Sequence, residues 1–181
     1  MDDYRKALCH QLLAENSKKN VLLIASAIAR DEKKIKALVD IMKTESPPLN
    51  VRASWVFSVL ARSDKEYVLR YFNDLLPLLS PGSPEGMLRN LLQPISVAAV
   101  PPPFEGIVFD TCFSFAENKV YPHAVRANAM TVLYRISLRH PPLQKELIFF
   151  FEQMLMCEHA PSIKARARLL IKKLSKQERM F

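Results

Sequence analysis

The residue types of a thiol-based active site occur together at Asp110, Cys112 and His123. Such a site needs a cysteine beside a base that a third group orients. Asp110 and Cys112 are two residues apart in a segment with helical spacing, and side chains at i and i+2 of a helix do not face each other. With three glycines in all, the chain also lacks the glycine-rich phosphate and nucleophile motifs. The sequence therefore predicts no enzyme, no catalytic residue and no cofactor site.

Cysteine and histidine lie close together at Cys9–His10 and at Cys157–His159. A structural zinc site usually takes its four ligands from two such pairs. Neither pair here is matched by a second pair at the usual spacing. We therefore predict no metal site, and we expect Cys9, Cys112 and Cys157 to be reduced, buried thiols.

Four basic residues recur at nearly constant intervals: Arg52, Arg89, Arg126 and Lys164 are separated by 37, 37 and 38 residues. A fixed period in this range is typical of helical repeat proteins. An apolar residue precedes each of the four, and further apolar residues follow at helical spacing. The four bases therefore mark equivalent positions in a series of repeats.

A second amphipathic helix is expected before each helix that carries one of these bases. Segments containing proline separate the expected helices, as proline suits loops and first helical turns. Pro94 is the exception, and we expect it to kink or delay the helix that contains it. The pattern predicts ten helices in five pairs within one domain over residues 1–181. The approximate repeats are 1–31, 32–64, 65–100, 101–140 and 141–181.

The clearest copy, from Val125 to Leu133, has an apolar residue, an arginine and then small residues. This order of residues resembles the pattern of HEAT repeat proteins, and the resemblance covers nearly the whole chain. The copy around Arg89 departs from the pattern. The resemblance implies an all-α fold, namely a right-handed α–α superhelix of the HEAT or armadillo type with about five helix pairs. The stretches 52–56, 105–110 and 164–168 are also similar to small HEAT-like proteins of Bacteroidetes-type bacteria, a likeness that implies the fold and no activity.

The repeated bases have two interpretations. If the second helices of the pairs line a concave face, Arg52, Arg89, Arg126 and Lys164 form a ladder that could hold an acidic peptide or a phosphate backbone. Alternatively, each base binds neighbouring loop carbonyls or acids and ties the repeats together. Trp55, the only tryptophan, either fills core space between repeats or offers an aromatic anchor to a partner.

The net charge of +8 is concentrated near the C-terminus. Residues 160–181 carry seven Lys or Arg and one Glu, whereas residues 47–159 carry ten of each sign. Lys164, Arg168 and Lys172 share one helical face, and Arg166 and Lys173 flank a second face. This helix is either a solvated outer face or a contact for nucleic acid, anionic lipid or an acidic protein. Because the rest of the chain is nearly neutral, we expect any nucleic-acid binding to be weak and electrostatic.

Two expected first helices carry more apolar residues than one core can use. In the fourth, Ile107, Val108 and Cys112 belong to the expected core stripe, while Phe109 and Phe113 fall outside it. In the fifth, residues 147–151 are all apolar and circle the helix.

If Leu147, Phe150 and Phe151 face the core, Ile148 and Phe149 point elsewhere. We therefore predict an apolar patch made of Phe109, Phe113, Ile148 and Phe149, for a homodimer or a partner. The alternative is that the proline segment 101–103, or the C-terminus at Met180 and Phe181, covers this patch.

These patterns together predict a non-enzymatic protein-binding or scaffold module with a protein partner. Nucleic-acid association through the C-terminal basic helix is the alternative. No run of about 18 apolar residues is present, so we predict no membrane span. The N-terminus opens on Asp2 and Asp3 rather than on an apolar stretch, and we therefore predict a cytoplasmic location.

Overall fold

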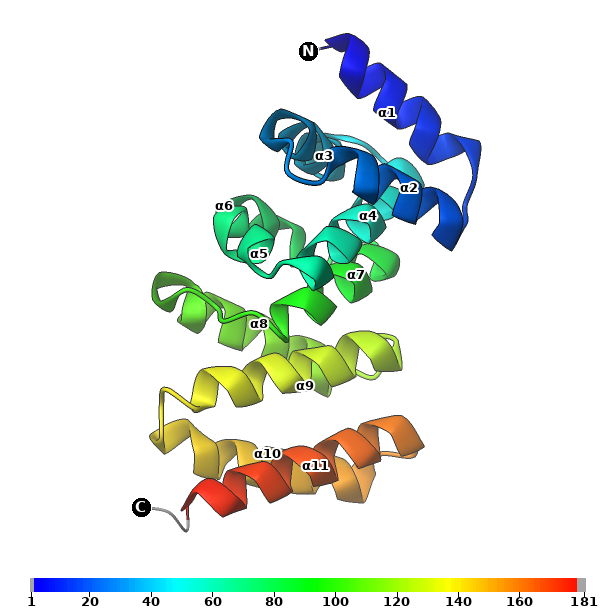
Figure 1. The fold of residues 1–181 in the computed structure, drawn as a ribbon. Coiled ribbons are helices and arrows are strands. Elements are labelled where there is room, and N and C mark those ends of the chain that lie inside the picture. Colours follow the sequence, from blue (N-terminus) through cyan, green and yellow to red (C-terminus); the bar gives the residue numbers. More distant parts are fainter. Residues whose placement is uncertain (1, 179–181) are drawn as a thin grey trace. The chain divides into compact units, whose positions relative to one another are not determined.

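The computed structural model describes residues 2–178, and this part of the chain contains helices and no strand (Figure 1). The all-α prediction is confirmed. The chain forms two compact units, residues 1–94 and 95–181, and each is described by itself. The predicted repeat boundaries all fall in segments between helices.

The first unit contains three helical pairs. Their helices are α1 (Asp2–Ala14), α2 (Lys18–Ile28), α3 (Glu32–Thr44), α4 (Leu49–Ser63), α5 (Glu66–Arg70), α6 (Phe72–Leu75), the 3-10 turn η1 (Leu76–Leu78) and α7 (Glu85–Ile95). Side-chain caps start two of them, because the Ser17 hydroxyl accepts from the Asn20 amide and Asp31 accepts from the Lys34 amide.

The first helix of the third pair is broken, although its apolar spacing predicts one helix. Tyr71, with φ −101° and ψ 14°, separates α5 from α6, and Pro77 lies in the 3-10 turn that follows. Phe72 and Leu75 are nevertheless buried, so the apolar positions still reach the core. Spacing predicts the buried face here but not the interruptions.

Helix α7 approaches α4 closely near Gly86. A Cβ atom added at Gly86 would lie 2.8 Å from Cγ1 of Val51, so the two helices meet where a side chain is missing. Further along, the Asn90 amide donates to the Ser54 hydroxyl at 3.0 Å. Pro94 lies inside α7, which ends one residue later at Ile95. The proline therefore does not delay the start of this helix at Glu85, and the expected kink stays a prediction.

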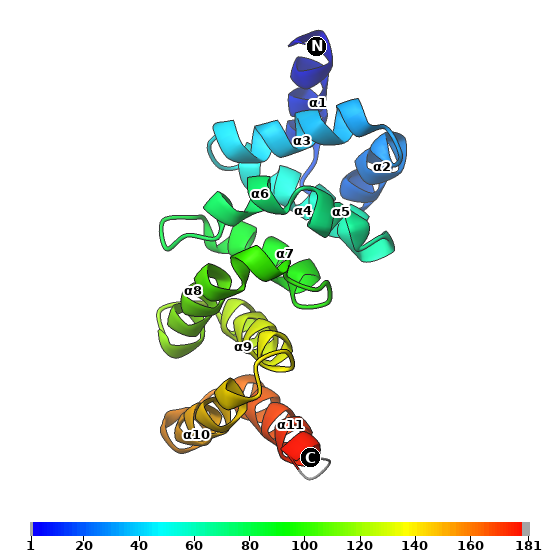
Figure 2. The ribbon, with the colours of Figure 1, turned by 90° about the vertical axis from the view of Figure 1, so that its left-hand side faces the viewer.

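The second unit contains η2 (Pro102–Phe104), α8 (Glu105–Glu117), α9 (His123–Ser137), α10 (Pro142–Cys157) and α11 (Pro161–Glu178). The pairs α8–α9 and α10–α11 form successive layers, and α9 packs against α8, α10 and α11 (Figure 2). Ala129 of α9 and Ala167 of α11 are fully buried, which lets these two second helices pack closely. Phenylalanines occupy the corresponding space between the first helices α8 and α10.

Two expectations about the core of this unit are wrong. Ile107 is 56% exposed, because the buried stripe of α8 begins at Glu105 and continues through Val108 and Cys112. Phe150 is half-buried rather than part of the α10 core, where Gln144 takes a buried position instead. No helix of residues 2–178 is long and apolar enough to cross a membrane.

Candidate protein-binding site

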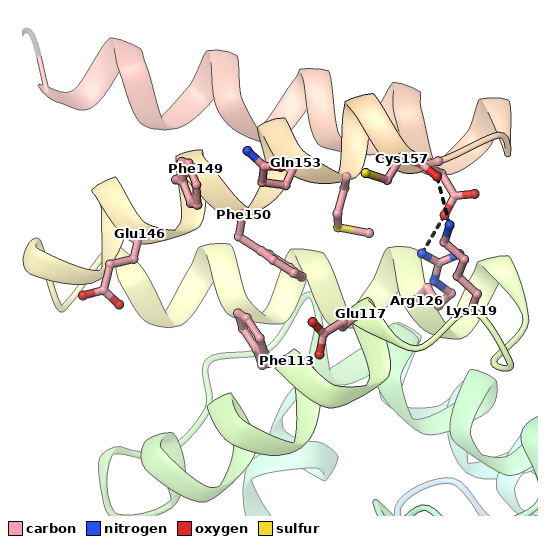
Figure 3. Close-up of a pocket in the computed structure, with 11 residues that line it drawn as sticks. Phe113, Glu117, Lys119, Arg126, Glu146, Phe149, Phe150, Gln153 and Cys157 are labelled. Atoms are coloured by element: carbon pink, nitrogen blue, oxygen red, sulfur yellow. Dashed lines mark hydrogen bonds and ion pairs between the residues drawn. The ribbon is translucent and has the colours of Figure 1, made fainter.

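A hollow of about 460 Å³ opens between α8 and α10 in the second unit (Figure 3). We call it the main hollow. Its apolar lining consists of Phe113 from α8 and of Phe149, Phe150 and Met154 from α10. The side chain of Phe149 is 64% exposed and is the one exposed phenylalanine among residues 2–178. An aromatic ring beside an apolar hollow is what a protein partner can cover.

A row of stacked rings crosses from α8 to α10. Phe113 and Phe150 point toward each other, with ring centroids 4.4 Å apart and planes 30° apart (Figure 3). Phe109, one turn earlier on α8, stacks on Phe113 at 6.5 Å. These rings fix the spacing of the two helices while leaving Phe149 free at the edge of the hollow.

A second hollow of about 270 Å³ lies at the start of the same two helices. Glu105, Phe109 and Asp110 line it from α8, together with His140 from the loop before α10 and Leu143 from the first turn of α10. The main hollow is lined by residues from the later turns of α8 and α10. We call the two hollows together the α8–α10 groove.

A buried ion pair closes the far end of the main hollow. Arg126, 3% exposed, has Nη2 at 2.6 Å from Oε2 of Glu158 and donates from Nε to the Ala116 carbonyl at 3.0 Å. Beside it, Nζ of Lys119 donates to the carbonyl of Cys157 at 2.9 Å (Figure 3). Both cations therefore hold the loops around the hollow in place.

The surroundings of Glu158 keep it ionised. Burial opposes the charge and would raise its pKa, but three groups outweigh that effect. They are the Ala160 amide, the Arg126 guanidinium and the His159 amide, and they lower the pKa of Glu158 to about 2. The pair is therefore charged at neutral pH.

The second hollow contains another buried carboxylate. Glu105 is 6% exposed, and its Oε2 lies 2.6 Å from Nε2 of His140. Arg139 forms an ion pair with the same carboxylate and donates to the Val100 carbonyl at 2.6 Å. This cluster ties the segment before α8 to the end of α9. The spacing of apolar residues in the sequence did not predict this polar cluster.

The acidic residues on the rim of the groove are exposed and unpaired. Asp110 lines the second hollow, while Glu117 and Glu146 line the main one. None of the three forms a hydrogen bond or an ion pair with another residue of the described chain. The rim thus carries free negative charge in a protein whose net charge is +8.

The four repeated bases have different surroundings. In the first unit, Arg52 donates to the carbonyls of Leu12 and Leu13, at 2.9 and 3.1 Å, whereas Arg89 is exposed. In the second unit, Arg126 is buried in its ion pair and Lys164 is half-buried. Arg52 therefore binds neighbouring carbonyls, and Arg126 binds a carbonyl and an acid. The ladder interpretation of the four bases stays a prediction.

Trp55 of α4 is half-buried. Its role as a core filler or as an anchor stays a prediction.

The predicted basic helix is α11. Arg168 and Lys172 are exposed, while Nζ of Lys173 lies 5.6 Å from the centre of the Tyr134 ring. The neighbouring Arg166 is bonded to the Ala127 carbonyl at 3.4 Å and to the Thr131 hydroxyl. Part of the positive charge of α11 is therefore used to hold α11 on α9.

The predicted apolar patch is rearranged in the structure. Phe113 and Phe149 line the main hollow, whereas Phe109 lines the second one. Ile148 is half-buried and lines neither. Phe150, which was expected to face the core, completes the row of rings instead. Met180 and Phe181, suggested as a cover for the patch, lie outside the described residues.

The cysteines differ from the prediction of three buried thiols. All three are free, but Cys157 is exposed and Cys9 is only partly buried. Burial is the main cause that raises the pKa of Cys9, and burial alone raises the pKa of Cys112 far above its usual range. Cys112 is thus inaccessible and protonated, which is unsuitable for a nucleophile. No group of residues suited to a metal ion occurs in the described part of the chain.

The HEAT repeat domain family matches residues 8–174. The chain belongs to this family, whose match covers both units. No curated protein and no solved structure matches the chain. The narrower likeness to HEAT-like proteins of Bacteroidetes-type bacteria therefore stays a prediction.

Proposed function

We propose that this chain is a non-enzymatic protein-binding module and that the α8–α10 groove is its binding surface. The observation that carries the proposal is the exposed ring of Phe149 beside the apolar main hollow. HEAT repeat domains generally act as repeat scaffolds and interaction modules. Aromatic side chains in such hollows contribute much of the energy of protein interfaces.

The expected energetic contribution of Phe149 follows from its exposure. Complete burial of a phenylalanine is worth roughly 1.5–3 kcal/mol, and about two thirds of this side chain is still open to solvent. A partner that covers the ring therefore gains about 1–2 kcal/mol, which is roughly 5- to 30-fold in affinity.

The test is recovery of a partner from native lysate, quantified by mass spectrometry, with wild type, Phe149→Asp and Met156→Asp. Met156 is the matched control, because it lies on the same helix, is 77% exposed and lines neither hollow. We expect Phe149→Asp to lose the partner and Met156→Asp to retain it. Equal recovery by both variants would assign binding to another surface.

Nucleic-acid association is the second candidate, favoured by the exposed Arg168 and Lys172 on α11. Phosphate contacts make such binding weak and strongly dependent on salt. We expect replacement of Lys164, Arg168, Lys172 and Lys173 by Gln to abolish retention on DNA at low salt. Tight binding that resists salt and survives these changes would contradict a purely electrostatic contact.

Self-association through the same groove is tested by light scattering after size exclusion. A homodimer that uses the groove dissociates in Phe113→Asp/Phe149→Asp while its helical content stays the same. If the wild type is a monomer, the partner that binds the groove is a different protein. The three free thiols fit a reducing compartment such as the cytoplasm, and that location stays a prediction.

A further inference from the structure

The charges of the α8–α10 groove limit what can bind there. Lys119 is bonded to a carbonyl, and Arg126 is neutralised by Glu158. In the second hollow, Arg139 and His140 face the buried carboxylate of Glu105. Among the groove's described side chains, three acids form no ion pair, namely Asp110, Glu117 and Glu146, against one such cation, the exposed Lys119, so the excess charge of the rim is negative. A partner with basic residues around an apolar centre complements this surface.

The positions of the two hollows define the spacing of the partner's apolar residues. Glu105, Gly106, Phe109 and Asp110 line the second hollow from α8, and Phe113 and Glu117 line the main one. The centres of these two sets are about two helical turns apart, or ~11 Å at 1.5 Å per residue. Two side chains at i and i+7 of a helix are separated by nearly the same distance on one face.

The walls of the groove favour a helix over an extended peptide. The backbone groups of α8 and α10 are bonded within their own helices. An extended peptide would find no strand edge to pair with and would leave its amides without partners. A helix satisfies its own backbone and presents side chains only.

The chain's own basic helix is not the occupant. The apolar face of α11, formed by Ile163, Ala167, Leu170 and Leu174, is buried within the second unit. A second copy could therefore offer the charges of α11 and the exposed Leu169, but not two apolar anchors seven residues apart, since Ser162 and Lys176 occupy those positions.

We propose that the α8–α10 groove binds an amphipathic helix of a partner protein, with apolar anchors at i and i+7 and with Lys or Arg on both flanks. This inference rests on the proposed protein-binding function and names the partner's chemistry.

The test uses a fluorescein-labelled, alanine-based helical peptide of roughly 16 residues, long enough to be helical. It carries Leu at i and i+7 and Lys on the flanks, and binding is read by fluorescence anisotropy. Glu117→Lys/Glu146→Lys should weaken its affinity by about 10-fold or more, since like charges then face each other. Glu152→Lys, an exposed acid on α10 that lines neither hollow, should change it by less than about 2-fold.

Two altered peptides complete the design. A peptide with Glu in place of Lys should bind wild type poorly. Its affinity should be restored when the protein carries Glu117→Lys/Glu146→Lys. A peptide with its anchors at i and i+5 puts them on different faces and should bind poorly to every variant.

Equal binding of the Lys and Glu peptides to wild type, or an equal loss on Glu152→Lys, would overturn the inference. If those results occurred while a lysate partner still depended on Phe149, the protein-binding function would stand and only the basic helix would be rejected.

Discussion

Replacing Glu158 with Gln removes one charge from the buried ion pair and leaves its geometry nearly unchanged. Oε1 of Glu158 accepts from the His159 amide at 2.8 Å and from the Ala160 amide at 3.1 Å, and a glutamine oxygen can do the same. Arg126, 3% exposed, then keeps its positive charge without a carboxylate. The substitution therefore isolates the electrostatic part of the interaction.

The magnitude follows from the pKa of Glu158. A fall from 4.5 to about 2 is worth ~3 kcal/mol of stability at neutral pH. Breaking a buried pair by removing one partner costs roughly 3–5 kcal/mol, and the value from the pKa lies at the lower end of this range. We therefore expect Glu158→Gln to lower the free energy of unfolding by about 3 kcal/mol at pH 7.

The pH dependence has a definite sign. The folded-state pKa of Glu158 is depressed, so its contribution to stability is fully present above the unfolded pKa. The contribution decreases as the pH falls from about 5 toward 2. Wild type and Glu158→Gln should therefore become similarly stable at the acidic end of this window.

The assay is urea unfolding followed by circular dichroism from pH 2.5 to 8. Glu152→Gln on the exposed side of α10 is the control and should match wild type. Arg126→Met/Glu158→Gln removes the buried charge altogether and should be less destabilised than Glu158→Gln alone. A Glu158→Gln protein as stable as wild type at pH 7, or a loss that is the same at pH 3 and pH 7, would refute the reasoning.

Two further predictions concern packing and thiol access. Gly106→Ala should raise the free energy of unfolding by about 0.5–1 kcal/mol, because its Cβ meets nothing within 4 Å. Gly86→Ala should instead lower it by about 1 kcal/mol, because Val51 must move, and urea titration of both variants checks this. Iodoacetamide should modify the exposed Cys157 in the folded protein and reach the buried Cys112 only after unfolding, as peptide mass spectrometry would show. Rapid modification of Cys112 in the native state, or a stabilised Gly86→Ala, would contradict these expectations.

The fold was predictable because repeated apolar spacing determines which face of a helix is buried. The 37-residue period located the second helices, and the prolines marked the loops between them. The same method failed where a polar residue occupies a core position. Glu105 starts the buried stripe of α8 because Arg139 forms an ion pair with its carboxylate and His140 lies within hydrogen-bond distance of it, while Ile107 lies at the surface.

The site was only partly predictable for a related reason. Composition showed that residues 147–151 could not all face one core, and Phe149 is exposed. Which ring would turn toward α8 depends on the gap between two helices that are distant in sequence. Phe150 fills that gap by stacking on Phe113, a contact that no spacing rule within one helix reveals.

The binding role of the α8–α10 groove is tested most directly by photo-crosslinking in cells that make both this protein and its partner. The photoreactive residue p-benzoylphenylalanine replaces Phe149 in one variant and Met156, exposed on the same helix, in the other. We predict a discrete crosslinked partner from position 149 and none from position 156. The same adducts from both positions, or adducts from position 156 alone, would contradict a binding site in this groove.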